Sequence, residues 1–252
     1  MEKRKMIQIC ICCSCFLAVI YGIARLDKVH RRYKNNEITT MAEKKKADRE
    51  VFSPQRIMYI TFEDGPGLYT QDILYILDRY DIKATFFVTG MDQEYTHLLK
   101  DIQQSGHAIG LHSFSHDEKD IYSDVDAYFN DLGKISALVK KETSDVSKLI
   151  RFPMDSSMTV STKQENMNAK LMRHCENLGF SFYNWNVDSE DENPDTSKDQ
   201  IYKNVIENIK GKEEVVLRLH DGSDNKNTML ALDEILQELI RQGWEFRILE
   251  GA

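Results

Sequence analysis

From residue 55 onward, the chain alternates between short apolar runs and longer segments whose apolar residues recur at helical spacing. The short runs predict strands over 57–62, 84–88, 108–111, 149–152, 180–187, 215–219 and 244–249. The amphipathic segments predict helices over 70–80, 95–104, 124–141, 165–178, 200–209 and 228–241. This alternation, about seven β/α units, predicts a parallel sheet with helices outside it, either an open doubly wound sheet or a closed barrel.

The first 54 residues follow a different pattern. A short basic tail, 1–6, precedes residues 7–24, which carry no charged side chain and just reach the length of about 18 residues that a membrane-spanning helix needs. Residues 25–54 are polar and charged, and they predict a spacer before a domain at 55–252. A cleaved signal peptide is the alternative to an anchor. We expect an uncleaved anchor because charged residues follow the apolar stretch at once.

Charge and cysteine content limit the classes of function. Residues 1–50 hold 12 Lys and Arg against 6 Asp and Glu, which leaves a net charge of −14 on the rest of the chain. So acidic a domain is a poor candidate for binding nucleic acid, and no protein partner can be inferred. Basic residues flank both ends of 7–24, so charge does not decide the orientation of the anchor. Only Cys175 lies outside the apolar stretch, which excludes a disulfide framework in the domain.

Ionisable residues gather at the ends of the predicted strands. In α/β folds, the carboxyl ends of parallel strands meet at one edge, where ligands bind. The residues at that edge are Glu63, Asp64, His112, His116, Arg151, Asp188, His220 and Asp221. Two His four residues apart together with Asp64 form a donor set suited to a catalytic divalent metal that keeps positions open for water and substrate.

These motifs also resemble a known family. Thr61-Phe-Glu-Asp-Gly-Pro66, His112-Ser-Phe-Ser-His116, Arg151-Phe-Pro153, Trp185-Asn-Val-Asp188 and Leu219-His220 are similar, in order and spacing, to the five motifs of the polysaccharide deacetylases, also called the NodB-homology domain or carbohydrate esterase family four. The resemblance covers about residues 55–250. It implies a distorted (β/α) barrel and a metal-dependent hydrolase that removes acetyl groups from N-acetylglucosamine-type sugars of peptidoglycan, chitin-like oligomers or another envelope or extracellular polysaccharide.

The resemblance also implies a role for each matching residue. The expected ligands of one divalent ion, Zn²⁺ or alternatively Co²⁺, are Asp64, His112 and His116. The expected groups of the reaction are Glu63 as general base, Arg151 holding that base ionised, His220 as general acid and Asp188 orienting His220. The expected substrate contacts are Pro153, Met154, Trp185 and Leu219.

Glu63 departs from the family pattern, which has Asp at this position, and the extra methylene displaces the carboxylate by roughly 1 Å. The leading hypothesis is a single-pass, membrane-anchored deacetylase whose domain lies on the extracellular side. One alternative is a catalytically weak or inactive relative that keeps the metal site for sugar binding or envelope organisation. The other is a metal-dependent amide hydrolase with a substrate that is not a sugar.

Overall fold

The structure is a computed structural model that describes residues 55–153 and 162–251. The expected tail, anchor and spacer, together with Met154, lie outside the described residues. Among the helices of the described ranges, none combines the length and the apolar character needed to cross a bilayer.

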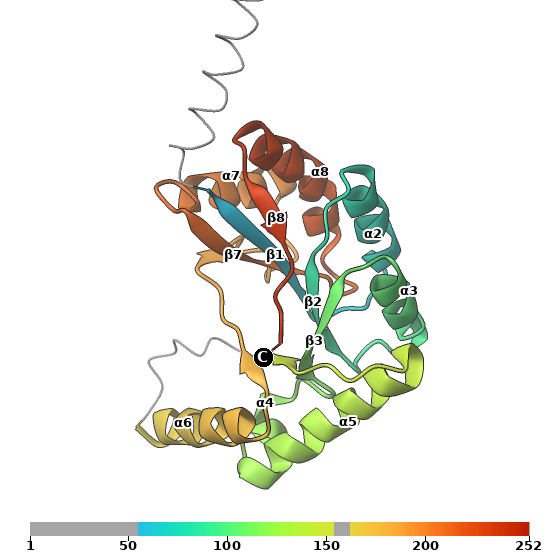
Figure 1. Cartoon of the computed structure of the whole chain (residues 1–252), viewed down its shortest axis with the longest axis vertical. Helices are drawn as coiled ribbons and strands as arrows, with labels where there is room; N and C mark the ends of the chain where they lie inside the picture. Colours follow the sequence, from blue (N-terminus) through green and yellow to red (C-terminus); the bar gives the residue numbers. More distant parts are fainter. Residues whose placement is uncertain (1–54, 154–161, 252) are drawn as a thin grey trace, which may run out of the picture. The chain divides into compact units, whose positions relative to one another are not determined.

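Parallel strands form a half-barrel in this part of the chain (Figure 1). The strands are β1 (Ile57–Glu63), β2 (Thr85–Thr89), β3 (Ala108–Ser113), β4 (Leu149–Ile150), β5 (Ser181–Phe182), β6 (Val187–Asp188), β7 (Glu214–His220) and β8 (Glu245–Arg247). Their order is β5-β4-β3-β2-β1-β7-β6, and β8 pairs with the first residues of β1. Within the described ranges β5 and β6 are not paired, so the barrel is open and the expected distorted (β/α) barrel is confirmed.

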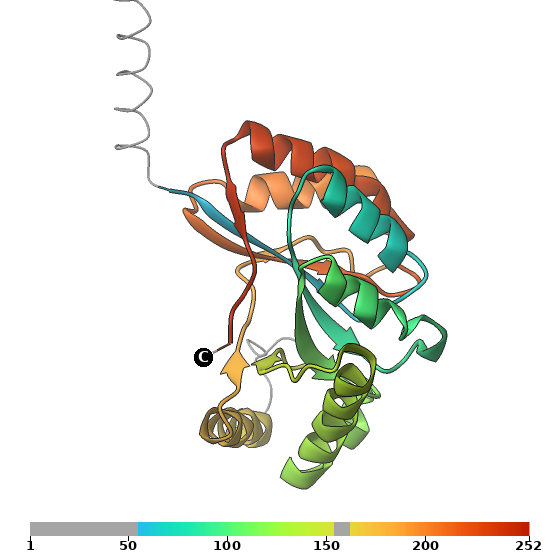
Figure 2. The same ribbon diagram turned by 45° about the vertical axis from the view of Figure 1, so that its right-hand side comes forward.

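Helices follow the strands around the outside of the sheet. They are α2 (Thr70–Arg79), α3 (Leu98–Gln104), α4 (Glu118–Ile121), α5 (Val125–Thr143), α6 (Thr162–Asn177), α7 (Lys198–Asn208) and α8 (Lys226–Arg241), with a short 3-10 helix η1 (Gln93–Tyr95) before α3. Neighbouring helices contact in the order α7, α8, α2, α3, α5, α6, which repeats the order of the strands. Figure 2 shows α7, α8, α2 and α3 along one side of the sheet.

One predicted strand is wrong in its extent. The run 180–187 divides into β5 and β6, with an irregular segment between them. Arg151 explains the break, because its Nε donates to the carbonyl of Tyr183 at 3.0 Å and its Nη2 donates to that of Asn184 at 3.3 Å. The guanidinium thus takes carbonyl oxygens that a continuous strand would offer to a neighbouring strand.

The two faces of β1 have opposite character. Met58, Ile60 and Phe62 have no exposed surface and belong to the large hydrophobic cluster shared with the helices. Thr61 and Glu63 alternate with them and face the inside of the half-barrel, as strand geometry requires. There the fully buried Arg151 donates from Nη1 to Thr61 Oγ1 at 2.8 Å and to Glu63 Oε1 at 2.9 Å. The inner face of β1 therefore carries the ion pair of Glu63 and Arg151 at the carboxyl ends of the strands.

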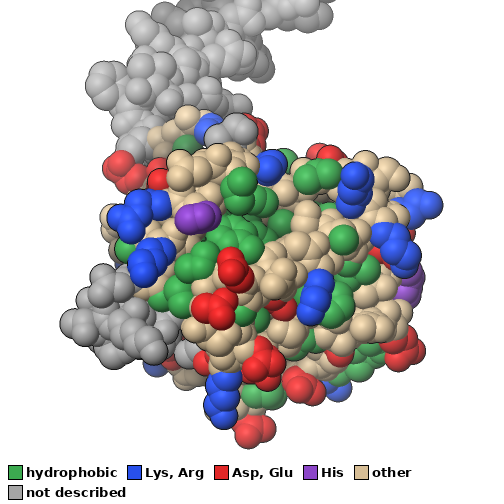
Figure 3. Space-filling model, turned by 90° about the horizontal axis from the view of Figure 1, so that it is seen from below, with side chains coloured by type: hydrophobic (Ala, Val, Ile, Leu, Met, Phe, Trp, Pro, Cys, Tyr) green, Lys and Arg blue, Asp and Glu red, His purple; other side chains and the backbone are tan. Residues whose placement is uncertain are grey.

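A cavity of about 660 Å³ lies at the opposite end of the strands from these groups. Its walls include Tyr59, Tyr183 and Phe246, and two of its charged side chains pair with each other, since Lys83 Nζ lies 3.6 Å from Asp81 Oδ1. Figure 3 shows one face of the molecule, where hydrophobic side chains gather near the centre with acidic side chains beside them. This cavity is not the candidate active site, because the cluster of ionisable side chains lies at the other end of the strands.

Candidate active site

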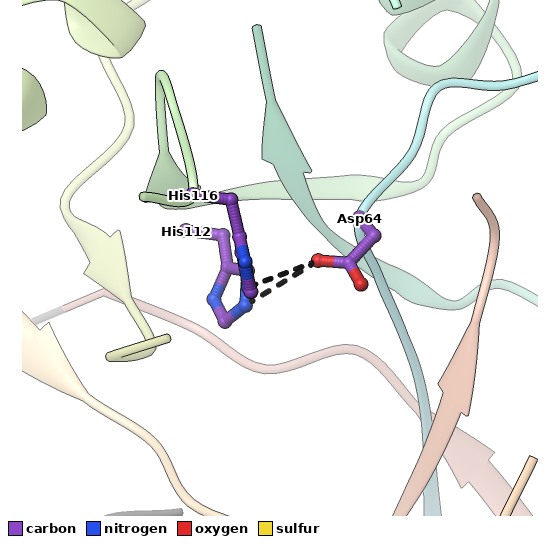
Figure 4. A group of neighbouring side chains, drawn as sticks. All are labelled: Asp64, His112 and His116. Atoms are coloured by element: carbon purple, nitrogen blue, oxygen red, sulfur yellow. Dashed lines mark ion pairs between the residues drawn. The ribbon is translucent and has the colours of Figure 1, made fainter. Parts of the chain in front are cut away.

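Asp64, His112 and His116 form a compact group at the ends of β1 and β3 (Figure 4). Asp64 Oδ1 lies 3.6 Å from His112 Nε2 and 3.5 Å from His116 Nε2, and the three ligand atoms lie within 4.8 Å of one another. Asp64 Oδ1 is buried and accepts no hydrogen bond in the described part of the chain. A buried carboxylate oxygen that faces two imidazole nitrogens fits a divalent cation, which would satisfy all three donors.

The protonation of His112 suits metal binding. Its Nδ1 donates to the carbonyl oxygen of Arg151 at 2.9 Å, which leaves the lone pair of Nε2 directed at Asp64. Burial lowers the pKa of His112 and outweighs the charge of Asp64, which acts to raise it. The pKa falls to about 3. The ring is therefore neutral at physiological pH, in the tautomer that a metal needs.

The backbone carrying the ligands has an unusual conformation. Asp64 and His116 have φ angles of 69° and 53°, in the left-handed region that non-glycine residues seldom occupy. Asp131 of α5 holds the turn after β3, because its two oxygens accept four hydrogen bonds, from Ser113 Oγ, the Phe114 amide, and the amide and Oγ of Ser115. Burial acts to raise the pKa of Asp131, but these bonds outweigh it and lower that pKa. An ionised helix carboxylate thus fixes the loop that presents His116.

Glu63 lies beside this group, buried at the end of β1. Its Oε1 accepts the hydrogen bond from Arg151, while its Oε2 lies 3.6 Å from His220 Nε2 and 3.9 Å from His112 Nε2. Arg218 Nη1 is also 3.9 Å from Oε2. One oxygen is therefore anchored, and the other faces the histidines, as a proton acceptor requires.

His220 forms a buried ion pair with Asp191. His220 Nδ1 donates to Asp191 Oδ1 at 2.6 Å, and Asp191 Oδ2 accepts from the His220 amide at 2.9 Å and from Thr228 Oγ1 at 2.6 Å. Burial alone would lower the pKa of His220, but the hydrogen bond and charge of Asp191, with a contribution from Glu63, raise it to about 9. At neutral pH, the ring carries a proton on Nε2 that points toward Glu63.

The structure corrects the role expected of Asp188. Its carboxylate accepts from Arg218 Nη2 at 2.5 Å, whereas Asp191 makes the contact with His220. The reason is register: Asp188 of β6 pairs with Arg218 of β7, and the chain must continue three residues further to reach His220. The sequence reasoning missed Asp191, although it lies only three residues after Asp188, and Arg218 was visible as a charge that interrupts an apolar strand.

The expected substrate contacts have different outcomes. The side chain of Leu219 has no exposed surface and packs in the core under the helices, so its expected contact with substrate is wrong. Trp185 is half-buried, with its ring 4.1 Å from Arg218 Cζ and 5.6 Å from Arg151 Cζ. Pro153 is buried and accepts a hydrogen bond from the Tyr122 hydroxyl at its carbonyl oxygen. Substrate contacts by Trp185, Pro153 and Met154 stay predictions.

Asp221 is a further buried carboxyl that the sequence placed at the strand ends. Its Oδ2 accepts from Thr70 Oγ1 at 2.8 Å, and its Oδ1 has no hydrogen-bond partner among the described residues. Burial, with a smaller contribution from the charge of Asp64, raises its pKa well above the ordinary value. Asp221 is therefore a buried carboxyl at the strand end whose surroundings favour its protonated form.

Fold and site together define the class of protein: an α/β half-barrel with a cluster of histidines and carboxylates at the carboxyl ends of its parallel strands. A family model described as polysaccharide deacetylase matches residues 51–172. A peptidoglycan-N-acetylglucosamine deacetylase of Bacillus cereus is 29% identical over 98% of this chain and 93% of its own length.

Solved structures agree with this comparison. The catalytic domain of a peptidoglycan N-acetylglucosamine deacetylase from Eubacterium rectale is 31% identical, with a TM-score of 0.73 over 80% of this chain and 94% of that domain. A family 4 acetyl xylan esterase from Clostridium thermocellum, solved with a cobalt ion, is 26% identical, with a TM-score of 0.63 over 77% of this chain and 88% of that one. The chain belongs to the polysaccharide deacetylase family, carbohydrate esterase family four, a family of hydrolases.

Proposed function

We propose that this protein is a metal-dependent deacetylase that removes acetyl groups from N-acetylglucosamine residues of a cell-envelope polysaccharide. The observation that carries the proposal is the group Asp64, His112 and His116 beside a carboxylate, Glu63, and a protonated imidazole, His220. The relatives named for peptidoglycan N-acetylglucosamine make that polymer the first substrate to test, with chitin-like oligomers second.

Asp64, His112 and His116 would hold the metal ion, and their mixed oxygen and nitrogen donors suit Zn²⁺, with Co²⁺ as the alternative supported by the cobalt ion of the Clostridium thermocellum relative. When bound, a divalent ion polarises the amide carbonyl and lowers the pKa of a bound water. The hydrogen bond from His112 Nδ1 to the Arg151 carbonyl keeps the other ring nitrogen available as a ligand.

Two side chains move the protons of the reaction. Glu63 Oε2 accepts a proton from the attacking water, and the hydrogen bond from Arg151 to Oε1 holds this carboxylate in place. His220 donates its Nε2 proton to the sugar nitrogen as the carbon–nitrogen bond breaks, so the products are acetate and a free amine. Because Glu63 Oε2 and His220 Nε2 are 3.6 Å apart, the proton taken from water passes from Glu63 to His220 and restores both groups.

We also propose that residues 7–24 anchor the protein in the membrane as a single span and that the domain at 55–252 lies on the extracellular side, where an envelope polysaccharide is found. Cell fractionation and protease treatment of intact cells test this proposal. It requires the full chain in the membrane fraction and a domain that external protease degrades.

The activity is tested with the full chain, in detergent, on N-acetylglucosamine oligomers and on peptidoglycan, with Zn²⁺ or Co²⁺ added. We expect acetate release that depends on the metal and is abolished in Asp64→Ala. Acetate at the level of that variant, combined with binding of the oligomers, would instead support a relative that keeps the site for sugar binding. Release of acetate from other acetylated amides but not from sugars would support a different substrate.

A further inference from the structure

Arg218 is a charged residue in the middle of an otherwise apolar strand, and it has no role in the proton transfers proposed for deacetylation. It lies in β7 two residues before His220, so both side chains face the inside of the half-barrel. Its guanidinium is fixed on two sides: Nη2 bonds Asp188 Oδ2 at 2.5 Å, and Cζ lies 4.1 Å from the centre of the Trp185 ring. Only 9% of Arg218 is exposed.

The other end of this guanidinium faces Glu63. Arg218 Nη1 lies 3.9 Å from Glu63 Oε2, which is too long for a hydrogen bond but well within the range of a charge interaction. Arg151 bonds the other oxygen, Oε1, at 2.9 Å. The carboxylate therefore lies between two buried guanidinium groups, one on each oxygen.

A second guanidinium group is needed to hold the carboxylate of Glu63, because a glutamate side chain has one more rotatable bond than an aspartate. The hydrogen bond from Arg151 fixes Oε1, but the carboxylate remains free to turn about that contact and move Oε2 away from His220. A guanidinium that is itself held by Asp188 and Trp185 attracts Oε2 from a fixed direction. It thus restrains the freedom that the extra methylene of Glu63 introduces.

We propose that Arg218 is a positioning residue for Glu63: locked by Asp188 and stacked on Trp185, it holds the second carboxylate oxygen of the base toward His220 and the group of Asp64, His112 and His116. The part of this inference that concerns rate rests on the proposed deacetylase function. The coupling between Arg218 and Glu63 is a property of the fold and is measured separately.

The kinetic test is a double-mutant cycle with Arg218→Met, Glu63→Asp and the double variant. Arg218→Met keeps much of the side-chain volume and removes the charge, and we expect kcat to fall on the order of tenfold or more, with KM changed by less than about threefold. In the Glu63→Asp background the same change should cost less than about threefold, since the shorter carboxylate lacks the torsion that Arg218 restrains. Equal losses in both backgrounds, or an unchanged kcat, would overturn the proposal.

Two further variants separate positioning from folding. Asp188→Asn keeps the cation but loosens it, and Asp188 is partly exposed, so we expect a folded protein with a smaller loss of kcat than Arg218→Met. Arg218→Lys keeps the charge but loses the planar stack on Trp185, and it should restore only part of the rate. The matched control is Arg241→Met, because Arg241 is an exposed arginine on α8 that pairs with Glu238. Full rescue by lysine would show that charge alone acts and would contradict the positioning role.

A stability cycle needs no activity. The free energies of unfolding of Glu63→Gln, Arg218→Met and the double variant are measured by denaturant titration. We expect the double variant to lose less than the sum of the single losses, because each single change removes the same interaction. Strictly additive losses would overturn the coupling. A wild-type chain that releases no acetate but shows this coupling would refute the proposed function while leaving the structural inference standing.

Discussion

Replacing Asp191 by Asn should move the alkaline limit of activity to lower pH. Asp191 holds His220 in its protonated form through a 2.6 Å contact with Nδ1, and this pair raises the pKa of His220 to about 9 although burial acts to lower it. Asparagine keeps the shape of the side chain but removes the charge. The pKa of His220 should then fall to its ordinary value of about 6.5 or below, since burial is no longer opposed.

The size of the effect follows from the protonated fraction. At pH 8, an imidazole with a pKa of about 9 is about 90% protonated, whereas one with a pKa of about 6.5 is about 3% protonated. Because the general acid acts only when protonated, kcat at pH 8 should fall about 30-fold from this cause alone. At pH 6, an imidazole with a pKa of about 6.5 is still about 75% protonated, so the loss attributable to protonation should be less than about twofold.

The assay is the pH dependence of kcat from pH 6 to 10, together with an NMR titration of the His220 ring. The sign is fixed: a lower pKa shortens the active range from its alkaline side. Asp188→Asn is the control, because Asp188 bonds Arg218 and not His220, so its alkaline limit should stay near that of the wild type. An alkaline limit that is unchanged in Asp191→Asn, or that moves in Asp188→Asn instead, would refute the roles of His220 as general acid and of Asp191 as its partner.

Three other outcomes are expected. A chelator should abolish acetate release and added Zn²⁺ or Co²⁺ should restore it, while activity that survives metal removal, verified by elemental analysis, would exclude a metal-dependent reaction. Glu63→Asp should lower kcat on the order of 10- to 100-fold, because Arg151 and His220 are spaced for the longer side chain, and a gain in activity would favour the weak or inactive relative. Asp131→Ala should weaken metal binding, measured by calorimetry, about 10- to 100-fold. The same change should lower the free energy of unfolding by about 2 to 3 kcal/mol, since buried donors of the turn lose their acceptor. A metal affinity equal to that of the wild type would show that the turn keeps its conformation without Asp131.

The sequence was sufficient for the parts of the site that depend on topology. Parallel strands bring their carboxyl ends to one edge whatever their lengths, so the β/α alternation predicted that Asp64, His112 and His116 lie at the same edge, and the structure brings them together. The contact between Arg151 and Glu63 was implied by the family resemblance, and the structure shows it as a hydrogen bond of 2.9 Å. The irregular segment between β5 and β6 was not predictable, since it depends on hydrogen bonds from Arg151, which is distant in the chain.

The errors involve side-chain direction and reach. Successive residues of a strand face opposite sides, and this parity would have assigned Leu219 to the core once His220 was placed inside, and Arg218 to the interior beside it. Asp191 was missed because its reach to His220 depends on where β6 ends, and that boundary is not encoded in the local pattern. Asp131 had no signal at all, because it lies on a helix and reaches the motif only through tertiary packing.

The adjacent carboxylates Glu63 and Asp64 illustrate how the fold separates two like charges. Strand parity turns Glu63 inward to Arg151, and the left-handed φ of 69° at Asp64 turns the next side chain toward the histidines. Glu63 thereby has Arg151 as its main partner and Asp64 has the two histidines, which removes much of the cost of placing the carboxylates side by side. This separation depends on the direction of the backbone and not on side-chain length, so a glutamate is accommodated at position 63. The guanidinium groups of Arg151 and Arg218 then restrain its additional torsion.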